Sequence, residues 1–285
     1  MENTKQVLAC IDGSRYSDAI CDYAAWISQS LGAPLKLLHN LEHSANAATA
    51  DLTGAIGLGS QEALLEELTE LEAKRNRLLL EQGKQMLEVA RKRVVAAGVE
   101  FPILKQRHDG LTESLIACED EIRVLVLGIR GEEHAQDELH LGSHLESSIR
   151  ALHKPILVVN GDFKQPEQVM LAYDGSEASS KALAMLADSP LFKSIPVHLV
   201  SVGEQTRNTG LFQAAADKLS NGGHDVTTAT LDGDTSASLH DYQDQHNIDL
   251  TLMGAFSHTR LREWVLGSLT VKMLLSSSRP LLLLR

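Results

Sequence analysis

Two short stretches decide the fold: VLACIDGS at Val7–Ser14 and VMLAYDGS at Val169–Ser176. Each is an apolar run that ends in Asp-Gly-Ser, and each is followed by a segment with helical periodicity. The ends of the two halves also correspond, because the spacing from a Gly-Ser pair to a proline is 13 positions in both 142–155 and 267–280. Repetition at both ends indicates two copies of one structural unit.

Each half alternates short apolar runs with helical segments. Continuous apolar runs between helices are typical of buried parallel strands with helices on both faces of the sheet. The predicted strands are Val7–Ile11, Leu35–His39, Ile103–Gln106, Val124–Leu127 and Ile156–Val159 in half one, and Val169–Tyr173, Val197–Val202, Thr227–Leu231, Leu250–Met253 and Leu281–Leu284 in half two. The sequence therefore predicts two α/β domains, 1–160 and 166–285, each with a five-stranded doubly wound sheet, joined by a polar linker at 160–168.

Half one carries an insertion over 44–76, because the Asp-to-Gly span from strand one to strand four is 36 residues longer than in half two. Residues 44–60 are rich in Gly, Ala and Thr and predict a loop, either one that covers a ligand or a surface excursion. Residues 62–97 predict one long helix.

The bulk composition excludes several classes of protein. With 26 basic and 38 acidic side chains the net charge is -12, which opposes general binding to nucleic acid or to anionic membranes. Cys10, Cys21 and Cys118 show no metal spacing and no CxxC pair, so reduced thiols are expected. No signal-peptide pattern and no run of 18 apolar residues is present, and these features predict a cytoplasmic protein.

The first strand of each half ends in an aspartate, Asp12 or Asp174. In an open parallel sheet, ligands bind beyond the carboxyl ends of the strands, so these carboxylates are placed to accept hydrogen bonds from a ribose or base, or to hold a metal ion that bridges phosphates. The alternative is that each carboxylate caps the following helix with the help of Ser14 or Ser176.

Glycines follow the fourth strand and precede the last helix. Gly128 and Gly131 allow close approach of phosphates to the backbone, and the pairs Gly142-Ser143 and Gly267-Ser268 open helices whose free N–H groups attract anions. A plain turn and an ordinary helix cap are the alternatives. No GxxxxGK[ST], GxSxG, HExxH or GxGxxG motif is present, so the sequence does not indicate P-loop, hydrolase, zincin or dinucleotide chemistry.

The G-x2-G-x9-G-S/T pattern after a strand, with Asp at the end of the first strand, resembles the universal stress protein family over nearly the whole chain. The resemblance implies two flavodoxin-like domains (of the adenine nucleotide alpha hydrolase-like type), packed as a pseudo-dimer through strands Ile156–Val159 and Leu281–Leu284. It also implies a regulatory protein that binds ATP or another adenine nucleotide, with Mg²⁺ as a further expected ligand. The implied contact residues are Asp174, Val202, Gly254, Ser257, Gly267 and Ser268 in half two, and Asp12, Asn40, Gly128, Gly131, Gly142 and Ser143 in half one.

Neither half matches the pattern fully. Half two has Ser257 in place of the second glycine, and its loop carries Arg260 and Arg262, which can pair with phosphate oxygens. Half one has ten residues before its Gly-Ser pair, and four of them, Glu132, Glu133, Asp137 and Glu138, are acidic and would repel a triphosphate. The hypothesis is that half two binds the nucleotide and half one has diverged.

His134, His140 and His144 in half one offer ligands for zinc, with solvated surface histidines as the alternative. Two other functions stay open at this point: a metal-dependent hydrolase or transferase acting in half one, and a scaffold with two degenerate sites. Slow ATP hydrolysis or autophosphorylation is implied only by the family, since the sequence shows no general base. The expected partners are an adenine nucleotide, a second copy of the chain and an unidentified protein.

Overall fold

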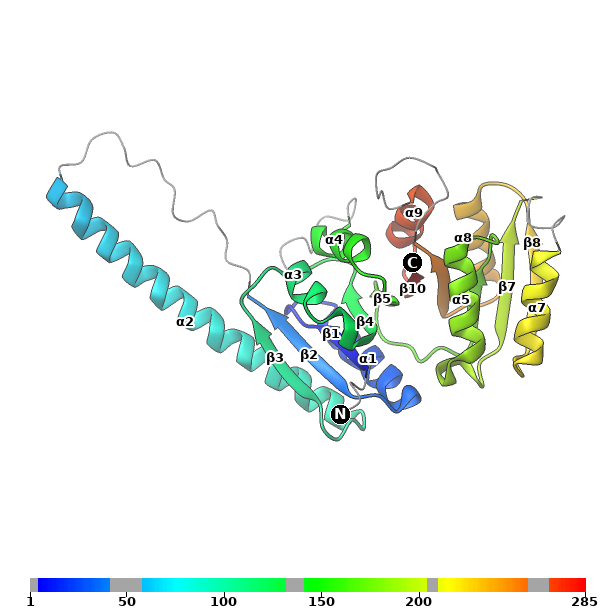
Figure 1. The fold of residues 1–285 in the computed structure, drawn as a ribbon, viewed down its shortest axis with the longest axis horizontal. Coiled ribbons are helices and arrows are strands. Elements are labelled where there is room, and N and C mark those ends of the chain that lie inside the picture. Colours follow the sequence, from blue (N-terminus) through cyan, green and yellow to red (C-terminus); the bar gives the residue numbers. More distant parts are fainter. Residues whose placement is uncertain (1–4, 42–57, 132–140, 204–209, 256–266) are drawn as a thin grey trace.

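A computed structural model of the chain describes residues 5–41, 58–131, 141–203, 210–255 and 267–285 (Figure 1). In half one the elements are β1 (Gln6–Cys10), α1 (Ser17–Leu31), β2 (Leu35–Asn40), α2 (Leu58–Ala96), β3 (Ile103–Arg107), α3 (Leu111–Ile116), β4 (Ile122–Gly128), α4 (Ser143–Ala151) and β5 (Ile156–Val159). In half two they are β6 (Val169–Ala172), α5 (Glu177–Asp188), β7 (Val197–Val202), α7 (Leu211–Asn221), β8 (Val226–Leu231), α8 (Thr235–Gln245), β9 (Leu250–Gly254), α9 (Ser268–Ser276) and β10 (Leu281–Leu284). Each of the ten predicted strands is confirmed, with ends that differ by at most two residues.

The ten strands form one sheet in the order β3-β2-β1-β4-β5-β10-β9-β6-β7-β8. Within each half the strands are parallel, and the strand order reverses between β1 and β4 in half one and between β6 and β9 in half two. The halves join through the antiparallel pair β5–β10, in which Leu157 lies opposite Leu282. The predicted pseudo-dimer and its contact strands are thereby confirmed.

Helices cover both faces of each half. In half one α1 packs with α2, and α3 packs with α4; in half two the pairs are α5 with α7 and α8 with α9. Every residue of β1, β5 and β10 is buried, which explains their unbroken apolar sequences. The outermost strands β3 and β8 are partly exposed, and their sequences, ILKQR and VTTATL, are correspondingly more polar.

The segment between β5 and β6 is held against both halves by side-chain contacts. The Phe163 ring packs edge-on against Tyr23 of α1, with ring centroids 4.7 Å apart. Asp249, before β9, accepts hydrogen bonds from the Lys164 ammonium at 2.6 Å and from the Glu167 backbone N–H at 2.9 Å. The connection therefore lies against the two bodies that it joins.

The insertion in half one is dominated by α2, which has 39 residues. It begins at Leu58, so the last three residues of the loop predicted over 44–60 are helical, and 42–57 lie outside the described residues. Its C-terminal part packs on β2, β3 and α1, whereas its N-terminal part projects beyond the sheet (Figure 1, cyan). Arg93 anchors the packed end through ion pairs of 2.8 Å with Asp18 and 2.7 Å with Asp22.

We predict that Leu157→Ala destabilises the protein by about 2–5 kcal/mol, because it removes buried methyl groups at the junction of the two halves. Leu157 and its partner Leu282 are each 1% exposed. Urea denaturation followed by circular dichroism measures the effect. Ile116→Ala is the control, since Ile116 is 52% exposed and its truncation should cost far less. Equal shifts of the two midpoints would contradict the assignment of β5 to the core.

Candidate functional site

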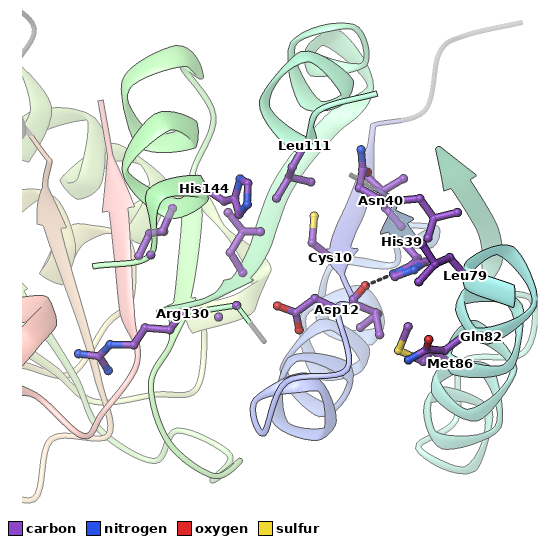
Figure 2. A pocket seen from close by; sticks show the side chains of 18 of the residues that line it. Cys10, Asp12, His39, Asn40, Leu79, Gln82, Met86, Leu111, Arg130 and His144 are labelled. Atoms are coloured by element: carbon purple, nitrogen blue, oxygen red, sulfur yellow. Dashed lines mark hydrogen bonds between the residues drawn. The ribbon is translucent and has the colours of Figure 1, made fainter. Parts of the chain in front are cut away.

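A cavity of about 270 Å³ opens at the carboxyl edge of the half-one sheet, where the strand order reverses. Its floor is formed by the ends of β1, β2 and β4, and α2 closes one side (Figure 2). Its apolar lining includes Leu38, Leu79, Met86, Leu111 and Leu145. The reversal of strand order is the place where doubly wound proteins bind ligands.

Five of the six candidate residues of half one line this cavity: Asp12, Asn40, Gly128, Gly131 and Gly142. They come from the ends of β1, β2 and β4 and from the start of α4. The sixth, Ser143, is the first residue of α4 and is exposed outside the lining. Residues that are up to 130 positions apart in the sequence thus converge on one small volume.

The two carboxylate oxygens of Asp12 face different segments. Oδ1 lies beside the segment that leads into α1, and Oδ2 lies beside the loop after β4. Its Oδ1 accepts a hydrogen bond from the backbone N–H of Ser14 at 3.0 Å, and the Ser17 hydroxyl lies 3.4 Å away. A Cβ atom at Gly131 would lie 3.1 Å from Oδ2, so a side chain there would crowd the second oxygen. Asp12 is not the cap of α1, because the N-cap position is occupied by Tyr16.

The glycines around the loop after β4 bring the backbone close together. A Cβ atom at Gly128 would lie 3.2 Å from the Arg130 carbonyl oxygen, and one at Gly142 would lie 3.2 Å from the Ile129 carbonyl oxygen. The Gly142 N–H donates a hydrogen bond to that Ile129 oxygen at 3.1 Å. The N-cap Gly142 makes no side-chain hydrogen bond to α4, and the N-terminus of a helix attracts anions.

Two buried polar atoms at the end of β2 have no hydrogen-bond partner among the described residues. The first is Nε2 of His39, a residue that is 5% exposed, and the second is Oδ1 of Asn40. His39 Nδ1 lies 2.8 Å from the Ile11 carbonyl oxygen, so Nδ1 donates this hydrogen bond and Nε2 is the ring nitrogen without a partner among the described residues. The Asn40 amide donates to the Asp109 carbonyl and to the Ser114 hydroxyl, both at 2.8 Å. Burying polar atoms without hydrogen-bond partners is costly, and a ligand that supplies an N–H or O–H group would satisfy the Asn40 oxygen.

Two features of the site were not predicted from the sequence: His39 and the wall formed by α2. The wall presents Arg75, Leu79, Gln82 and Met86 to the cavity, at helical spacings of three and four residues. Figure 2 shows Leu79, Gln82 and Met86 on this helix. His39 packs against this wall at Gly83, where a Cβ atom would lie 2.7 Å from His39 Nε2. A glycine in the middle of a long helix was the available signal, because glycine there is unfavourable unless another group needs the space.

In half two the candidate residues are only partly described. Asp174 is exposed, and its Oδ1 accepts from the Ser176 N–H at 2.9 Å, while Ser176 itself caps α5. Gly254 ends β9, where a Cβ atom would lie 2.7 Å from the Ala178 Cβ, so close packing of α5 already explains this glycine. Val202 ends β7 and is half-buried, Gly267 is the N-cap of α9, and the next residue, Ser268, is exposed. Ser257, Arg260 and Arg262 lie outside the described residues.

The predicted zinc ligands are also only partly described. His134 and His140 lie outside the described residues, and His144, on α4, lines the half-one cavity. Within the described ranges, no group of three His, Cys, Asp or Glu side chains is arranged to hold a metal ion. In the same part of the chain, no helix combines the length and the apolar composition needed to cross a membrane.

Fold and site together define a class: a tandem doubly wound α/β protein with a cavity where the strand order reverses. The sequence profile of the Universal stress protein family matches residues 3–160 and 203–285. The chain therefore belongs to the universal stress protein family.

Individual relatives agree with this assignment. The universal stress protein Slr1230 of Synechocystis is 34% identical over 289 residues, which cover 99% of this chain and 100% of that protein. A universal stress protein from Archaeoglobus fulgidus has a similar structure, with a TM-score of 0.71 at 17% identity and 98% coverage of both chains. PA1789 of Pseudomonas aeruginosa, described as functionally unknown, gives a TM-score of 0.63 at 13% identity over 99% of this chain and 92% of its own. At these identities the two solved structures show a shared fold.

We predict that none of the three thiols of the native protein reacts with Ellman's reagent at pH 8. Cys10 lines the cavity, but its thiol is buried, and burial, with the charge of Asp12, raises its pKa above the ordinary value. Burial raises the pKa of Cys21 to about 12 and also raises that of Cys118. Because only the thiolate reacts, all three stay protonated and slow at pH 8.

The measurement compares the native protein with protein in guanidinium chloride, where all three thiols should titrate. A fast reaction of one thiol per native protein molecule, which disappears in Cys10→Ser, would contradict this prediction and indicate a reactive thiol in the cavity.

Proposed function

We propose that this protein binds an adenine nucleotide at the carboxyl edge of its sheet and acts as a regulatory protein. The observation that supports the proposal is the convergence of Asp12, Asn40, Gly128, Gly131 and Gly142 on one cavity where the strand order reverses. Membership of the universal stress protein family supports the same ligand class.

The chemistry of the cavity fits the parts of a nucleotide. Asp12 offers a carboxylate oxygen to ribose hydroxyls, and a carboxylate accepts such hydrogen bonds more strongly than a neutral group does. Asn40 Oδ1 is a buried acceptor, which matches the exocyclic amine of adenine, and the His39 ring also lines the cavity. The bare backbone at Gly131 and Gly142 and the first turn of α4 suit phosphate oxygens. Mg²⁺ would offset phosphate charge.

The loop charges favour half two for a triphosphate. The half-two loop contributes Arg260 and Arg262, whereas the corresponding loop of half one contributes Glu132, Glu133 and Asp137 among its acidic residues. A triphosphate is therefore expected to bind more tightly in half two, while the half-one cavity accepts a less charged adenine compound. The domain limits 1–160 and 166–285 remain a prediction that accompanies this division.

The matched pair Asp12→Asn and Asp174→Asn tests the proposal, because asparagine keeps the shape of the side chain and an oxygen acceptor for the N–H two residues later. We expect Asp174→Asn to weaken binding of Mg·ATP at least tenfold, since a hydrogen bond to a charged group contributes about 1.5–3 kcal/mol. Asp12→Asn should leave the ATP affinity within about twofold, because half one is not expected to hold the triphosphate.

Isothermal titration calorimetry of metal-stripped protein with ATP and Mg²⁺ measures both variants, and thermal unfolding shows that each is folded. The reverse pattern, with ATP lost in Asp12→Asn alone, would move the triphosphate to half one. No binding of ATP, ADP, AMP or adenosine to the wild type, by calorimetry and by equilibrium dialysis, would overturn the proposal and favour a scaffold.

A further inference from the structure

The amide of Asn40, at the end of β2, is held in one orientation. Its Nδ2 group donates to the Asp109 carbonyl oxygen and to the Ser114 hydroxyl, both at 2.8 Å. A carbonyl oxygen only accepts hydrogen bonds, so the atom of the amide that faces Asp109 must be the nitrogen. The second contact is equally firm, because Ser114 is part of α3 and is 0% exposed. The two contacts therefore decide which way the amide oxygen faces.

The fixed orientation makes Asn40 an acceptor toward the cavity. Its Oδ1 is buried and has no hydrogen-bond partner among the described residues. Asn40 lines the half-one cavity, and Figure 2 shows it beside His39 at the end of β2. Turning the amide over would set Oδ1 against the Asp109 carbonyl oxygen and lose a hydrogen bond. The side chain is therefore not free to exchange its acceptor for a donor.

The backbone next to Asn40 is already used by the sheet. Asn40 lies opposite Arg107 in the parallel pair of β2 with β3, and the Leu41 N–H donates to the Arg107 carbonyl oxygen at 2.9 Å. That N–H group is committed within the protein. A ligand at this corner of the cavity therefore meets the side-chain oxygen of Asn40.

The corresponding strand of half two ends in a different kind of residue. Both β2 and β7 have six residues, and β7 ends in Val202 where β2 ends in Asn40. The valine side chain has no hydrogen-bonding group. The amide acceptor thus belongs to half one and is not a property of the repeat.

We propose that Asn40 makes the half-one cavity selective for a purine with an amino group at C6, which rests on the proposed function because an adenine compound must first enter that cavity. The C6 amine of adenine donates to the Asn40 oxygen, whereas a purine with a carbonyl at C6 presents a second acceptor to it. The oxygen then stays unpaired, and a site built to pair with an N–H group rejects an analogue that lacks it. Ser114 is a positioning residue, since it acts by holding the Asn40 amide.

Isothermal titration calorimetry with adenosine and inosine tests the proposal, because inosine carries a carbonyl where adenosine carries the amine. The titrations use Asp174→Asn protein, in which the half-two site is weakened. We expect adenosine to bind at least about tenfold more tightly than inosine. In Asn40→Leu the two dissociation constants should agree within about twofold, through a loss of adenosine affinity. Ser114→Ala should reduce the preference by less, because the Asp109 carbonyl still faces the amide nitrogen.

Asn221→Leu is the matched control, because Asn221 ends α7 in half two and is exposed, and it should keep the full preference for adenosine. Circular dichroism and thermal unfolding show whether each variant is folded. Equal binding of adenosine and inosine before any change at Asn40, or a preference that persists in Asn40→Leu, would overturn the selectivity and leave the proposed function standing. Absence of binding by every adenine compound tested would overturn both.

Discussion

The antiparallel pairing of β5 with β10 is the constraint on which the rest of the structure depends. Each half ends in a strand of four buried apolar residues, ILVV or LLLL, and such a strand cannot face water on its free edge without exposing both apolar side chains and unpaired backbone groups. When β5 pairs with β10, neither strand is left at an edge, and the two halves form one ten-stranded sheet. The junction is therefore a stability requirement for both halves.

The same junction separates the two candidate sites. Because all strands of a half are parallel and β5 runs against β10, the carboxyl ends of the two halves lie at opposite edges of the continuous sheet. The described cavity accordingly takes all its lining residues from half one. Each site can therefore change its loop charges independently, as the basic residues Arg260 and Arg262 and the acidic loop of half one illustrate.

The helical part of the half-one insertion forms one wall of the cavity. Among the described residues α2 borders the cavity, through Arg75, Leu79, Gln82 and Met86, whereas residues 42–57 of the predicted loop lie outside the described residues. The helix makes room for His39 at Gly83, and the ring fills that space while its Nε2 stays without a partner among the described residues. The helix thus has two roles: its buried face attaches it to the domain, and a neighbouring face forms the cavity wall.

The sequence alone determined the repeated α/β architecture, the ten strands and five of the residues that line the cavity, because these follow from local apolar runs and from the rule that parallel strands end at one edge. It could not separate glycines with different roles: Gly254 is required by the packing of Ala178, whereas Gly131 lies beside Asp12. The tertiary structure was needed to show that His39 is buried with a ring nitrogen unpaired among the described residues, that Ser143 is exposed outside the lining and that α2 forms a wall of the site. Those properties depend on contacts between segments far apart in the chain, and periodicity within a segment carries no information about what packs against it.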